Sequence, residues 1–376
     1  MLVEGDKSLL GEKLAVILNS SQSKTPCGND SWVARTAAAA RRIIDSGFVM
    51  ITSTGIVTWE LLVHLAAATS GRQVILCPVT GEGLEKELFD ITVADFGLDP
   101  NKCAMLFVGS PLRGRSPKKN WPGRDGQAVA MAQKIYPISI RPGGRLDTMI
   151  KSNADSGKID DRFHIEYAPA VYRPTHYDIS GIKLDVENWD FITHWTKTRH
   201  GPWPGETRSA FYGRLLASDN RYPNSAFDTL INIVRERKIR ASSDKIRDSF
   251  PAIGFSECPP IDILKMLRWC PRRVNWNFEP YGIAVKRPVA EKMGAKPVIY
   301  GIDEDYRKFS ESAKPFFQNR GGKAVDWRGE REWRHIGDFD FNQVPDDKIM
   351  FYVWRRIEAD YLRKLTSCPV MSFEGD

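Results

Sequence analysis

The feature that most constrains the fold is a regular alternation of strand-like and helix-like segments through the first 150 residues. Apolar runs at Leu14–Leu18 and Phe48–Thr52 are each followed by a polar turn and then by a helical segment, Trp32–Ser46 and Thr58–Thr69 respectively. Further apolar runs continue the pattern at Gln73–Cys77, Ala104–Val108 and Ile135–Ile140. Strands that alternate with helices build an open parallel sheet. The sequence therefore predicts a Rossmann-like α/β domain over residues 1–150.

Polar turns follow these predicted strands at their carboxyl ends, where open parallel sheets bind ligands. Asn19–Lys24 follows the first strand, Ser53–Gly55 the second and Arg141–Gly144 the last. Small residues at such turns let phosphates approach the amides of a helix N-terminus. We expect the three turns to converge on one anion-binding crevice. The candidate ligand residues of the first two turns are Ser20, Ser21, Ser53, Thr54 and Gly55.

The motifs of this region resemble those of the SLOG superfamily, which includes the DNA-processing protein DprA and the LOG nucleotide hydrolases. Ser53–Leu62 is similar to the glycine-rich turn and helix of that family, and Gly71–Leu76 to its next strand. Trp121–Val129 resembles its arginine-containing helix start, and Ile138–Leu146 the strand and glycine turn that close the site. The resemblance implies a nucleotide- or nucleic-acid-binding domain. The site residues that it adds are Arg124, Arg141, Gly143 and Gly144.

The second turn departs from the family pattern, since Ser53-Thr54-Gly55 stands where the family has a fuller set of glycines. This leaves open whether the domain binds or hydrolyses a nucleotide. Glu60 is the carboxylate to test for hydrolysis, and a plain helix-surface glutamate is the alternative. No GxGxxG fingerprint occurs, which argues against a dinucleotide dehydrogenase.

Positive charge is concentrated in one stretch of the chain. The net charge is +7, and residues 113–145 hold eight Lys or Arg residues against the single acid Asp125. Such a stretch is a candidate phosphate-binding surface for nucleic acid. A solvated basic loop is the alternative explanation.

Length and cysteine usage bound the class of protein. A chain of 376 residues is too long for one ordinary core and predicts two domains. No apolar run is long enough to span a membrane, and the acidic start at Met1–Asp6 is unlike a secretory signal, so we expect a cytoplasmic protein. The six cysteines lie far apart without a CxxC pair, which predicts reduced thiols and no metal site. The oligomeric state, including a homo-oligomer, stays open.

The remainder of the chain predicts a linker with short strands over 151–188 and an α+β domain with a mainly antiparallel sheet over 189–376. The polar segment Lys151–Gly157 is typical of a boundary. Strand-like runs then recur without an internal repeat, at Trp189–Thr196, Ala252–Cys258, Tyr281–Val285 and Lys296–Tyr300.

The segment Arg328–His335 crowds acids, bases and an indole into eight residues. As a strand it would place Glu330 and Glu332 on one face, where two carboxylates repel unless a cation, a ligand or a raised pKa resolves the conflict. This arrangement suits a catalytic carboxylate. An edge strand with solvated charges is the alternative.

The order of elements in the second domain resembles the DarT family of NAD-dependent ADP-ribosyltransferases and the AbiGi-like phage-resistance proteins. A His-Thr strand, a helix leading into a strand, a proline-capped aromatic strand and a late strand with the catalytic Glu follow one another in that pattern. The resemblance implies NAD as substrate, Glu332 and His194 with Glu330 as catalytic residues, and nearby cofactor contacts. Those contacts are Thr196, Arg240, Phe255 and Tyr281, with Arg235, Arg237 and Arg247 as the alternatives to Arg240.

Three functions are consistent with these observations. The first is an ADP-ribosyltransferase-like enzyme acting on nucleic acid or a nucleotide, in phage defence or DNA metabolism. The second is a non-catalytic nucleotide sensor, and the third is a DNA-binding protein. We expect the enzyme, with either binding protein as the alternative.

Overall fold

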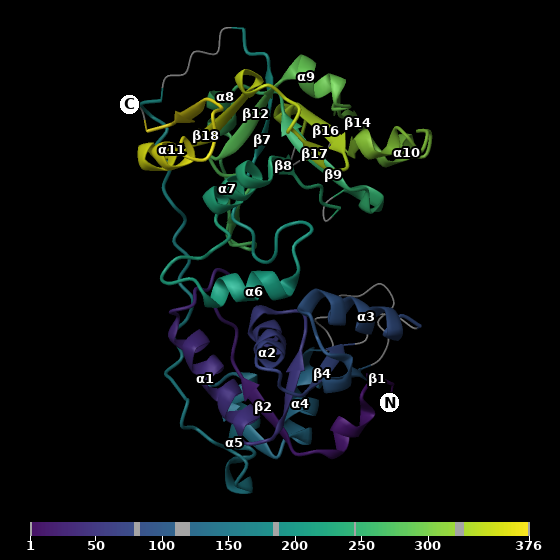
Figure 1. Cartoon of the computed structure of the whole chain (residues 1–376), viewed down its shortest axis with the longest axis vertical. Coiled ribbons are helices and arrows are strands. Elements are labelled where there is room, and N and C mark those ends of the chain that lie inside the picture. Colours follow the sequence, from purple (N-terminus) through teal and green to yellow (C-terminus); the bar gives the residue numbers. More distant parts are fainter. Residues whose placement is uncertain are drawn as a thin grey trace. The chain divides into compact units, whose positions relative to one another are not determined.

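A computed structural model of the chain describes residues 2–78, 83–109, 121–182, 188–243, 246–319 and 327–374. The chain forms two compact units (Figure 1). The first comprises Met1–Val171 together with Glu206–Pro223, and the second comprises Tyr172–Gly205 together with Asn224–Asp376. These bounds differ from the expected ones in two places: residues 151–171 belong to the first unit, and so does the segment Glu206–Pro223, which lies near the start of the expected second domain.

The first unit is built on a six-stranded sheet in the order β1-β5-β4-β3-β2-β6. Its strands are β1 (Val3–Gly5), β2 (Leu14–Leu18), β3 (Val49–Ser53), β4 (Gln73–Pro78), β5 (Cys103–Val108) and β6 (Lys134–Pro137). All neighbours pair in parallel except β1, which runs antiparallel to β5. β2 and β3 are buried along their whole length, because helices cover both faces of such a sheet.

Helices connect these strands as the alternating pattern predicts. They are α1 (Ser31–Asp45), α2 (Val57–Ala68), α3 (Glu85–Phe96), α4 (Trp121–Met131) and α5 (Arg145–Lys151). The buried face of α1 consists of small or branched residues such as Ala39, Ala40 and Ile43, which let the helix pack closely on the sheet. A sixth helix, α6 (Arg208–Leu216), packs against α2 and α3 and carries the segment 206–223 into this unit.

The second unit contains a seven-stranded sheet in the order β13-β16-β9-β7-β12-β18-β19. Its strands are β7 (Phe191–Trp195), β9 (Ala252–Ser256), β12 (Gly282–Lys286), β13 (Lys296–Pro297), β16 (Glu332–Ile336), β18 (Ile349–Val353) and β19 (Val370–Ser372). Within this sheet the β18–β19 pair is parallel, and the other pairs among the described residues are antiparallel. The expected architecture, a Rossmann-like domain followed by an α+β domain with a mainly antiparallel sheet, is confirmed.

Shorter elements complete the second unit. The helices are α7 (Ala226–Glu236), α8 (Pro260–Lys265), α9 (Arg287–Lys292), α10 (Asp303–Tyr306) and α11 (Arg356–Leu362). Two-stranded pairs form between β8 (Lys238–Ile239) and β17 (Phe339–Asp340), between β10 (Trp269–Cys270) and β11 (Asn275–Trp276), and between β14 (Ile299–Gly301) and β15 (Phe317–Asn319). No helix in the described ranges is long and apolar enough to cross a membrane.

The strand register of the second sheet assigns its side chains to two faces. Glu332 pairs with Ser256, and Ser256 pairs with Thr193, so these three side chains share one face. His194, next to Thr193, is on the opposite face. It lies there with Phe255, whose ring centroid is 5.9 Å from its own.

Candidate functional site

The three turns expected to form an anion-binding crevice in the first unit follow adjacent strands. β2 lies between β3 and β6, and all three are parallel, so their carboxyl ends meet at one edge of the sheet. The first and third turns contact each other directly: the Arg141 amide donates to the Ser20 hydroxyl at 2.8 Å, and the Ser20 amide donates to the Ser139 carbonyl at 2.9 Å. Because β3, β2 and β6 are adjacent and parallel, the three turns lie at the same edge of the sheet, as a shared crevice requires.

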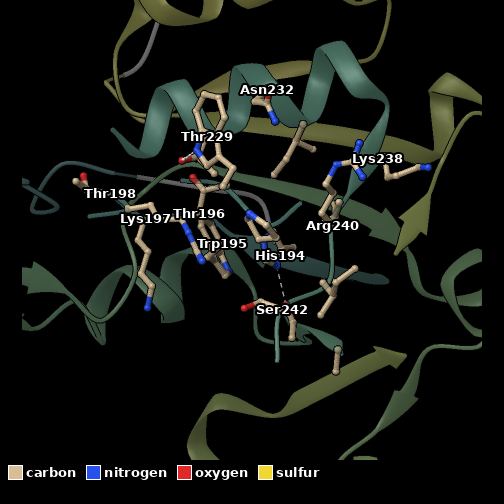
Figure 2. Close-up of a pocket in the computed structure, with 18 of the residues that line it drawn as sticks. His194, Trp195, Thr196, Lys197, Thr198, Thr229, Asn232, Lys238, Arg240 and Ser242 are labelled. Carbon is tan, nitrogen blue, oxygen red and sulfur yellow. Dashed lines mark hydrogen bonds between the residues drawn. The ribbon is translucent and has the colours of Figure 1, made fainter. Parts of the chain in front are cut away.

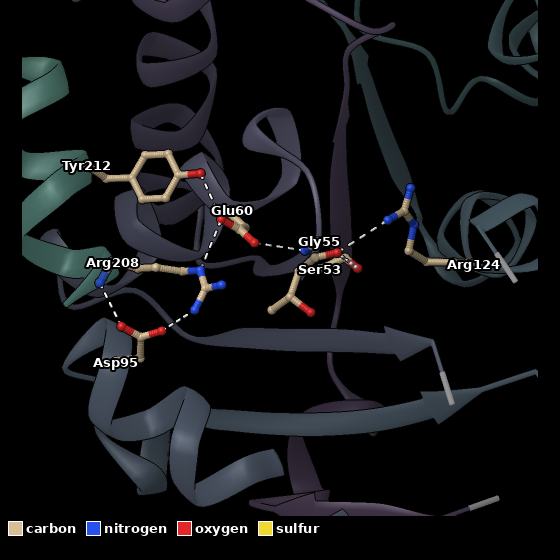
Figure 3. Close-up of polar contacts among 8 residues, drawn as sticks. Ser53, Gly55, Glu60, Asp95, Arg124, Arg208 and Tyr212 are labelled. Carbon is tan, nitrogen blue, oxygen red and sulfur yellow. Dashed lines mark hydrogen bonds and ion pairs between the residues drawn. The ribbon is translucent and has the colours of Figure 1, made fainter. Parts of the chain in front are cut away.

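The turn after β3 is closed by a carboxylate of the protein itself. The Gly55 amide donates to Glu60 Oε1 at 2.9 Å, across the first turn of α2 (Figure 3). Gly55 has a φ of +100°, a conformation that favours glycine. The Ser53 hydroxyl is buried and donates to the Leu76 carbonyl at 2.5 Å. Glu60 thus occupies the position where an anion would meet the Gly55 amide.

Helix α6 holds that carboxylate in place. The Tyr212 hydroxyl donates to Glu60 Oε2 at 2.9 Å, and Arg208 Nε lies 3.3 Å from the same oxygen (Figure 3). Arg208 also pairs with Asp95, whose carboxylate accepts from the Arg208 amide at 2.7 Å. Burial and the Glu60 charge raise the pKa of Tyr212 well above its ordinary value, so the phenol stays protonated and remains a donor.

Arg124 is buried in the first unit. Its guanidinium lies 5.0 Å from the Trp59 ring and 5.4 Å from the Trp121 ring, and it pairs with Asp125 at 2.8 Å. Its Nη1 donates to the Thr54 carbonyl at 3.4 Å (Figure 3). The side chain of Arg124 is only 2% exposed, so its hydrogen bond to Thr54 is a buried contact that supports the Ser53–Gly55 turn.

The turn after β6 is capped in the same way as the turn after β3. The Gly143 amide donates to Asp147 Oδ2 at 2.8 Å, and Gly144 is the N-cap residue of α5. Arg141 is exposed, and Ser21 offers its carbonyl to the Tyr167 hydroxyl at 3.2 Å. Of the residues predicted to bind phosphate in the first unit, Arg141 is the cation that the structure leaves at the surface.

A cavity of about 360 Å³ does lie at this edge of the sheet, between the loops that follow β2 and β6. Its lining includes Gln22, Ser23, the start of α1 at Ser31 and Trp32, and Ser139. Residues 165–170 close one side, where Ile165 bridges to Ser139. The sequence patterns did not signal that segment, because it has no regular periodicity.

No family model matches this chain, and no curated protein matches it significantly. Solved structures that are similar to it include two DNA processing proteins. DNA processing protein A from Helicobacter pylori, described for its single-stranded DNA binding mode, is 11% identical, with a TM-score of 0.30 over 42% of this chain and 68% of that one. DNA processing protein A (DprA) from Streptococcus pneumoniae is 16% identical, with a TM-score of 0.29 over 42% of this chain and 52% of that one.

The second unit has a cavity of about 280 Å³ beside His194 (Figure 2). The floor is the end of β7 and the start of β9, the roof is α7, and the walls are the loop 197–204 and the segment 238–242. Three predicted site residues, His194, Thr196 and Arg240, line it together. The lining also includes Lys197, Arg199, His200 and Lys238, so that four Lys or Arg residues line the cavity, and no Asp or Glu is among the described residues that do so.

His194 presents a hydrogen-bond acceptor in this cavity. Its Nδ1 lies 2.8 Å from the Gly254 carbonyl oxygen, and because a carbonyl only accepts, Nδ1 must carry the proton. Burial lowers the pKa of His194, and the charge of Lys197 lowers it further against the opposing effect of the Gly254 bond. The ring is therefore neutral near pH 7, with Nε2 unprotonated.

Thr196 and Arg240 hold the shape of the cavity through their own contacts. The buried Thr196 hydroxyl lies 2.8 Å from the Ala226 carbonyl and 3.2 Å from the Tyr281 carbonyl, which ties β7 to the start of α7. Arg240 Nε donates to Glu236 at 2.8 Å, and a guanidinium nitrogen lies 3.8 Å from Asp338. Neither acid lines the cavity, so both orient Arg240 from outside it.

Two predicted cofactor contacts lie in the core, away from the cavity lining. Phe255 is 2% exposed and packs on Phe339 at 5.4 Å between ring centroids. Tyr281 is 7% exposed, and its hydroxyl donates to Glu358 at 3.1 Å. Burial and the Glu358 charge raise the pKa of Tyr281. Both residues position the strands that carry His194 and Thr196.

The structure does not bring Glu332 to His194. Glu332 lies on the opposite face of the sheet, and its Oε1 pairs with the Nε of Arg334 at 2.8 Å. Arg334 is 3% exposed and also donates to the carbonyls of Pro315 and Phe317 at 2.9 and 2.8 Å. Glu332 thus neutralises a buried guanidinium.

The expectation that Glu330 shares a strand with Glu332 is corrected by the structure. Glu330 ends a 3-10 helix, Trp327–Glu330, and the strand begins only at Glu332. Arg331 between them has a φ of +46°, which breaks the alternation of a strand. Burial raises the pKa of Glu330, and the Glu332 charge raises it further, against weaker opposition from Arg268 and Lys197. The repulsion between the two carboxylates is therefore reduced in two ways: Glu332 forms an ion pair with Arg334, and the pKa of Glu330 is raised.

The predicted site missed most of the cations around the second cavity. Lys197, Arg199 and His200 follow the His-Thr strand in one loop, and Lys238 precedes Arg240. Lys197, Arg199 and His200 fall within four consecutive residues, and this clustering could have predicted a basic loop beside His194.

Proposed function

We propose that this protein binds a nucleotide through its phosphates in the cavity of the second unit. The observation that carries the proposal is the charge of the lining: four Lys or Arg residues, with no carboxylate among its described members. Phosphate is the biological anion best matched by such a set of charged donors.

The size and polar groups of the cavity also suit part of a nucleotide. At about 280 Å³ it lies just below the usual range for ligand pockets, roughly 300–1,000 Å³. A mononucleotide, or one half of a dinucleotide such as NAD, is the matching size. His194 Nε2 accepts a hydrogen bond from a ribose hydroxyl or a base amino group, and the Asn232 side chain lies on the roof above it (Figure 2).

Binding is supported better than ADP-ribosyl transfer. Transfer from NAD requires a carboxylate beside the ribose, where it stabilises the oxocarbenium-like state. Neither Glu330 nor Glu332 is among the lining residues, and Glu332 occupies the other face of the sheet. A nucleotide-binding protein is therefore the main proposal, and NAD turnover is the outcome that would replace it.

Calorimetric titration of the full chain with NAD, ADP, AMP and adenosine tests the proposal. We expect the phosphorylated ligands to bind and adenosine to bind at least about tenfold more weakly, since a charged hydrogen bond contributes about 1.5–3 kcal/mol. Lys238→Ala should weaken binding of the phosphorylated ligands. Lys265→Ala, at an exposed position of α8 that does not line the cavity, is the matched control. Equal affinity for AMP and adenosine would refute the proposal, and nicotinamide release from NAD would favour the transferase.

A second candidate function is nucleic-acid binding by the first unit. The observation that favours it is the run of eight cations against one acid over residues 113–145. Residues 113–119 lie outside the described part of the chain, while Arg141 and Arg145 at the end of the run are exposed. Binding to labelled single-stranded DNA that weakens steeply with salt supports this function, and binding that is absent at low salt removes it.

A further inference from the structure

The wall of the cavity in the second unit is held at Thr198 by two side chains from one neighbouring segment. The Thr198 amide donates to Glu279 Oε1 at 2.6 Å, and Asn275 Nδ2 donates to the Thr198 carbonyl at 2.9 Å. The Glu279 amide in turn donates to the Thr196 carbonyl at 3.1 Å. Thr196, Thr198 and Asn275 line the cavity, whereas Glu279 does not. Glu279 therefore fixes the wall from outside the cavity and leaves its interior to the ligand.

Glu279 is a buried carboxylate whose oxygens accept hydrogen bonds from uncharged donors. The residue is 7% exposed, its Oε1 accepts from the Thr198 amide, and its Oε2 accepts from the Tyr177 hydroxyl at 3.1 Å. A buried charge costs free energy unless hydrogen bonds satisfy it, and hydrogen bonds to a charged group are stronger than those between neutral groups. The carboxylate thus holds both donors, and loss of either donor leaves it less well satisfied.

Tyr177 belongs to the stretch 172–182, which opens the second unit and contains no helix or strand. Its ring is buried, with its centroid 5.5 Å from that of Trp276 and 5.0 Å from that of Trp354. Burial and the Glu279 charge raise the pKa of Tyr177, so the phenol stays protonated and remains a donor. The side chain of Tyr177 therefore anchors an otherwise irregular stretch to the residue that holds the cavity wall.

We infer that Tyr177 and Glu279 are positioning residues for the nucleotide, and that anchoring of the stretch 172–182 regulates the affinity of the cavity. This inference rests on the proposed function and assigns a regulation to the same site. With Tyr177 in place, Glu279 keeps the Thr198 backbone ordered before a ligand arrives. An ordered wall loses less conformational entropy on binding than a mobile one, so it binds the ligand more tightly. Because coupling between two sites is reciprocal, a bound nucleotide must also strengthen the anchoring of the stretch.

Titration of the full chain with AMP tests the inference through Tyr177→Phe, which removes the hydroxyl and keeps the ring that packs on Trp276 and Trp354. We expect AMP to bind about three- to tenfold more weakly, which is the effect of one hydrogen bond. Tyr361→Phe is the matched control, because it removes a hydroxyl that contacts Arg235 at a position that does not line the cavity. An AMP affinity of Tyr177→Phe equal to that of the wild type overturns the inference while nucleotide binding stands. Absence of AMP binding by the wild type overturns the proposed function, and the inference with it.

Hydrogen exchange measured by mass spectrometry separates positioning from a general loss of stability. In Tyr177→Phe, peptides that contain Thr198 should exchange faster, whereas peptides from β16 should be unchanged. AMP should slow the exchange of peptides from 172–182 in the wild type, and should do so less in the variant. Faster exchange throughout the second unit of the variant, or no effect of AMP on 172–182, overturns the inference.

Two variants of Glu279 provide a second test that leaves Tyr177 in place. Glu279→Gln keeps an oxygen that accepts from the Thr198 amide and gains an amide that donates to the Tyr177 hydroxyl, whereas Glu279→Ala keeps neither contact. AMP should therefore bind Glu279→Gln more tightly than Glu279→Ala. Equal affinities of the two variants would show that the Thr198 contact does not position the wall, and would overturn the inference.

Discussion

The backbone amide of Gly55 donates a hydrogen bond to the side chain of Glu60, five residues later, at 2.9 Å. The amide stands at the carboxyl edge of the first sheet, where open parallel sheets commonly bind phosphates. A carboxylate already satisfies it, and Tyr212 and Arg208 fix that carboxylate. Glu60 is therefore part of the framework of the first unit and more than a helix-surface residue.

Replacement of Glu60 should destabilise the first unit. Glu60→Ala leaves the buried Tyr212 hydroxyl and the Gly55 amide without their acceptor, which costs about 1–3 kcal/mol. Hydrogen exchange of the buried β3 amides reports this loss for the first unit alone. Glu87→Ala, at an exposed position of α3, is the control and should change stability by less than about 0.5 kcal/mol. Equal exchange rates of the β3 amides in the two variants would show that Glu60 is a helix-surface residue without a structural role.

Glu332 and Arg334 should behave as a buried structural pair. Arg334→Ala leaves the Pro315 and Phe317 carbonyls and the Glu332 carboxylate without a partner, and loss of one member of a buried pair costs about 3–5 kcal/mol. Glu332→Gln keeps the shape but removes the compensating charge, so it should also lower stability, by a smaller amount. Urea unfolding followed by tryptophan fluorescence measures both. If the Glu332→Gln protein is as stable as the wild type, Glu332 has no structural role in the pair, and a catalytic role becomes the remaining explanation for this carboxylate.

Glu330 should make the second unit less stable as the pH rises. Because its pKa is raised in the folded state, the folded protein keeps a proton that the unfolded chain has lost. The contribution of this group is complete below its ordinary pKa of 4.5 and is lost as the pH rises through the raised value. Glu330→Gln should therefore match the wild type near pH 4 and exceed it in stability near pH 8. Glu304→Gln, at an exposed position, should show no such pH dependence.

Charge removal from the basic run should weaken nucleic-acid binding by the first unit. Replacing Arg113, Arg115, Lys118 and Lys119 with Ala should reduce affinity for single-stranded DNA with little dependence on base sequence. The slope of log affinity against log salt should fall by roughly 0.7 per lost phosphate contact. A filter-binding or anisotropy titration at several salt concentrations gives the slope. An unchanged slope would identify the run as a solvated loop.

Local sequence patterns determined the elements and the fold class. The apolar run Leu14–Leu18 forms β2 with the same bounds, and the helix expected over Trp32–Ser46 forms α1 at Ser31–Asp45. Hydrophobic periodicity and capping act over a few residues, so one segment at a time carries the information. The structure places His194, Thr196 and Arg240, which the resemblance named as site residues, in the lining of one cavity, and their roles there stay a prediction.

Tertiary structure alone decided which groups remain available to a ligand. The left-handed conformation of Arg331 separates Glu330 from the strand, and the strand register sends Glu332 to the face opposite His194. Helix α6, distant in sequence, supplies the partners that fix Glu60. A motif lists charged residues, but pairing between distant segments determines whether each charge is already neutralised by the protein. That pairing depends on long-range packing, which no local pattern in the chain encodes.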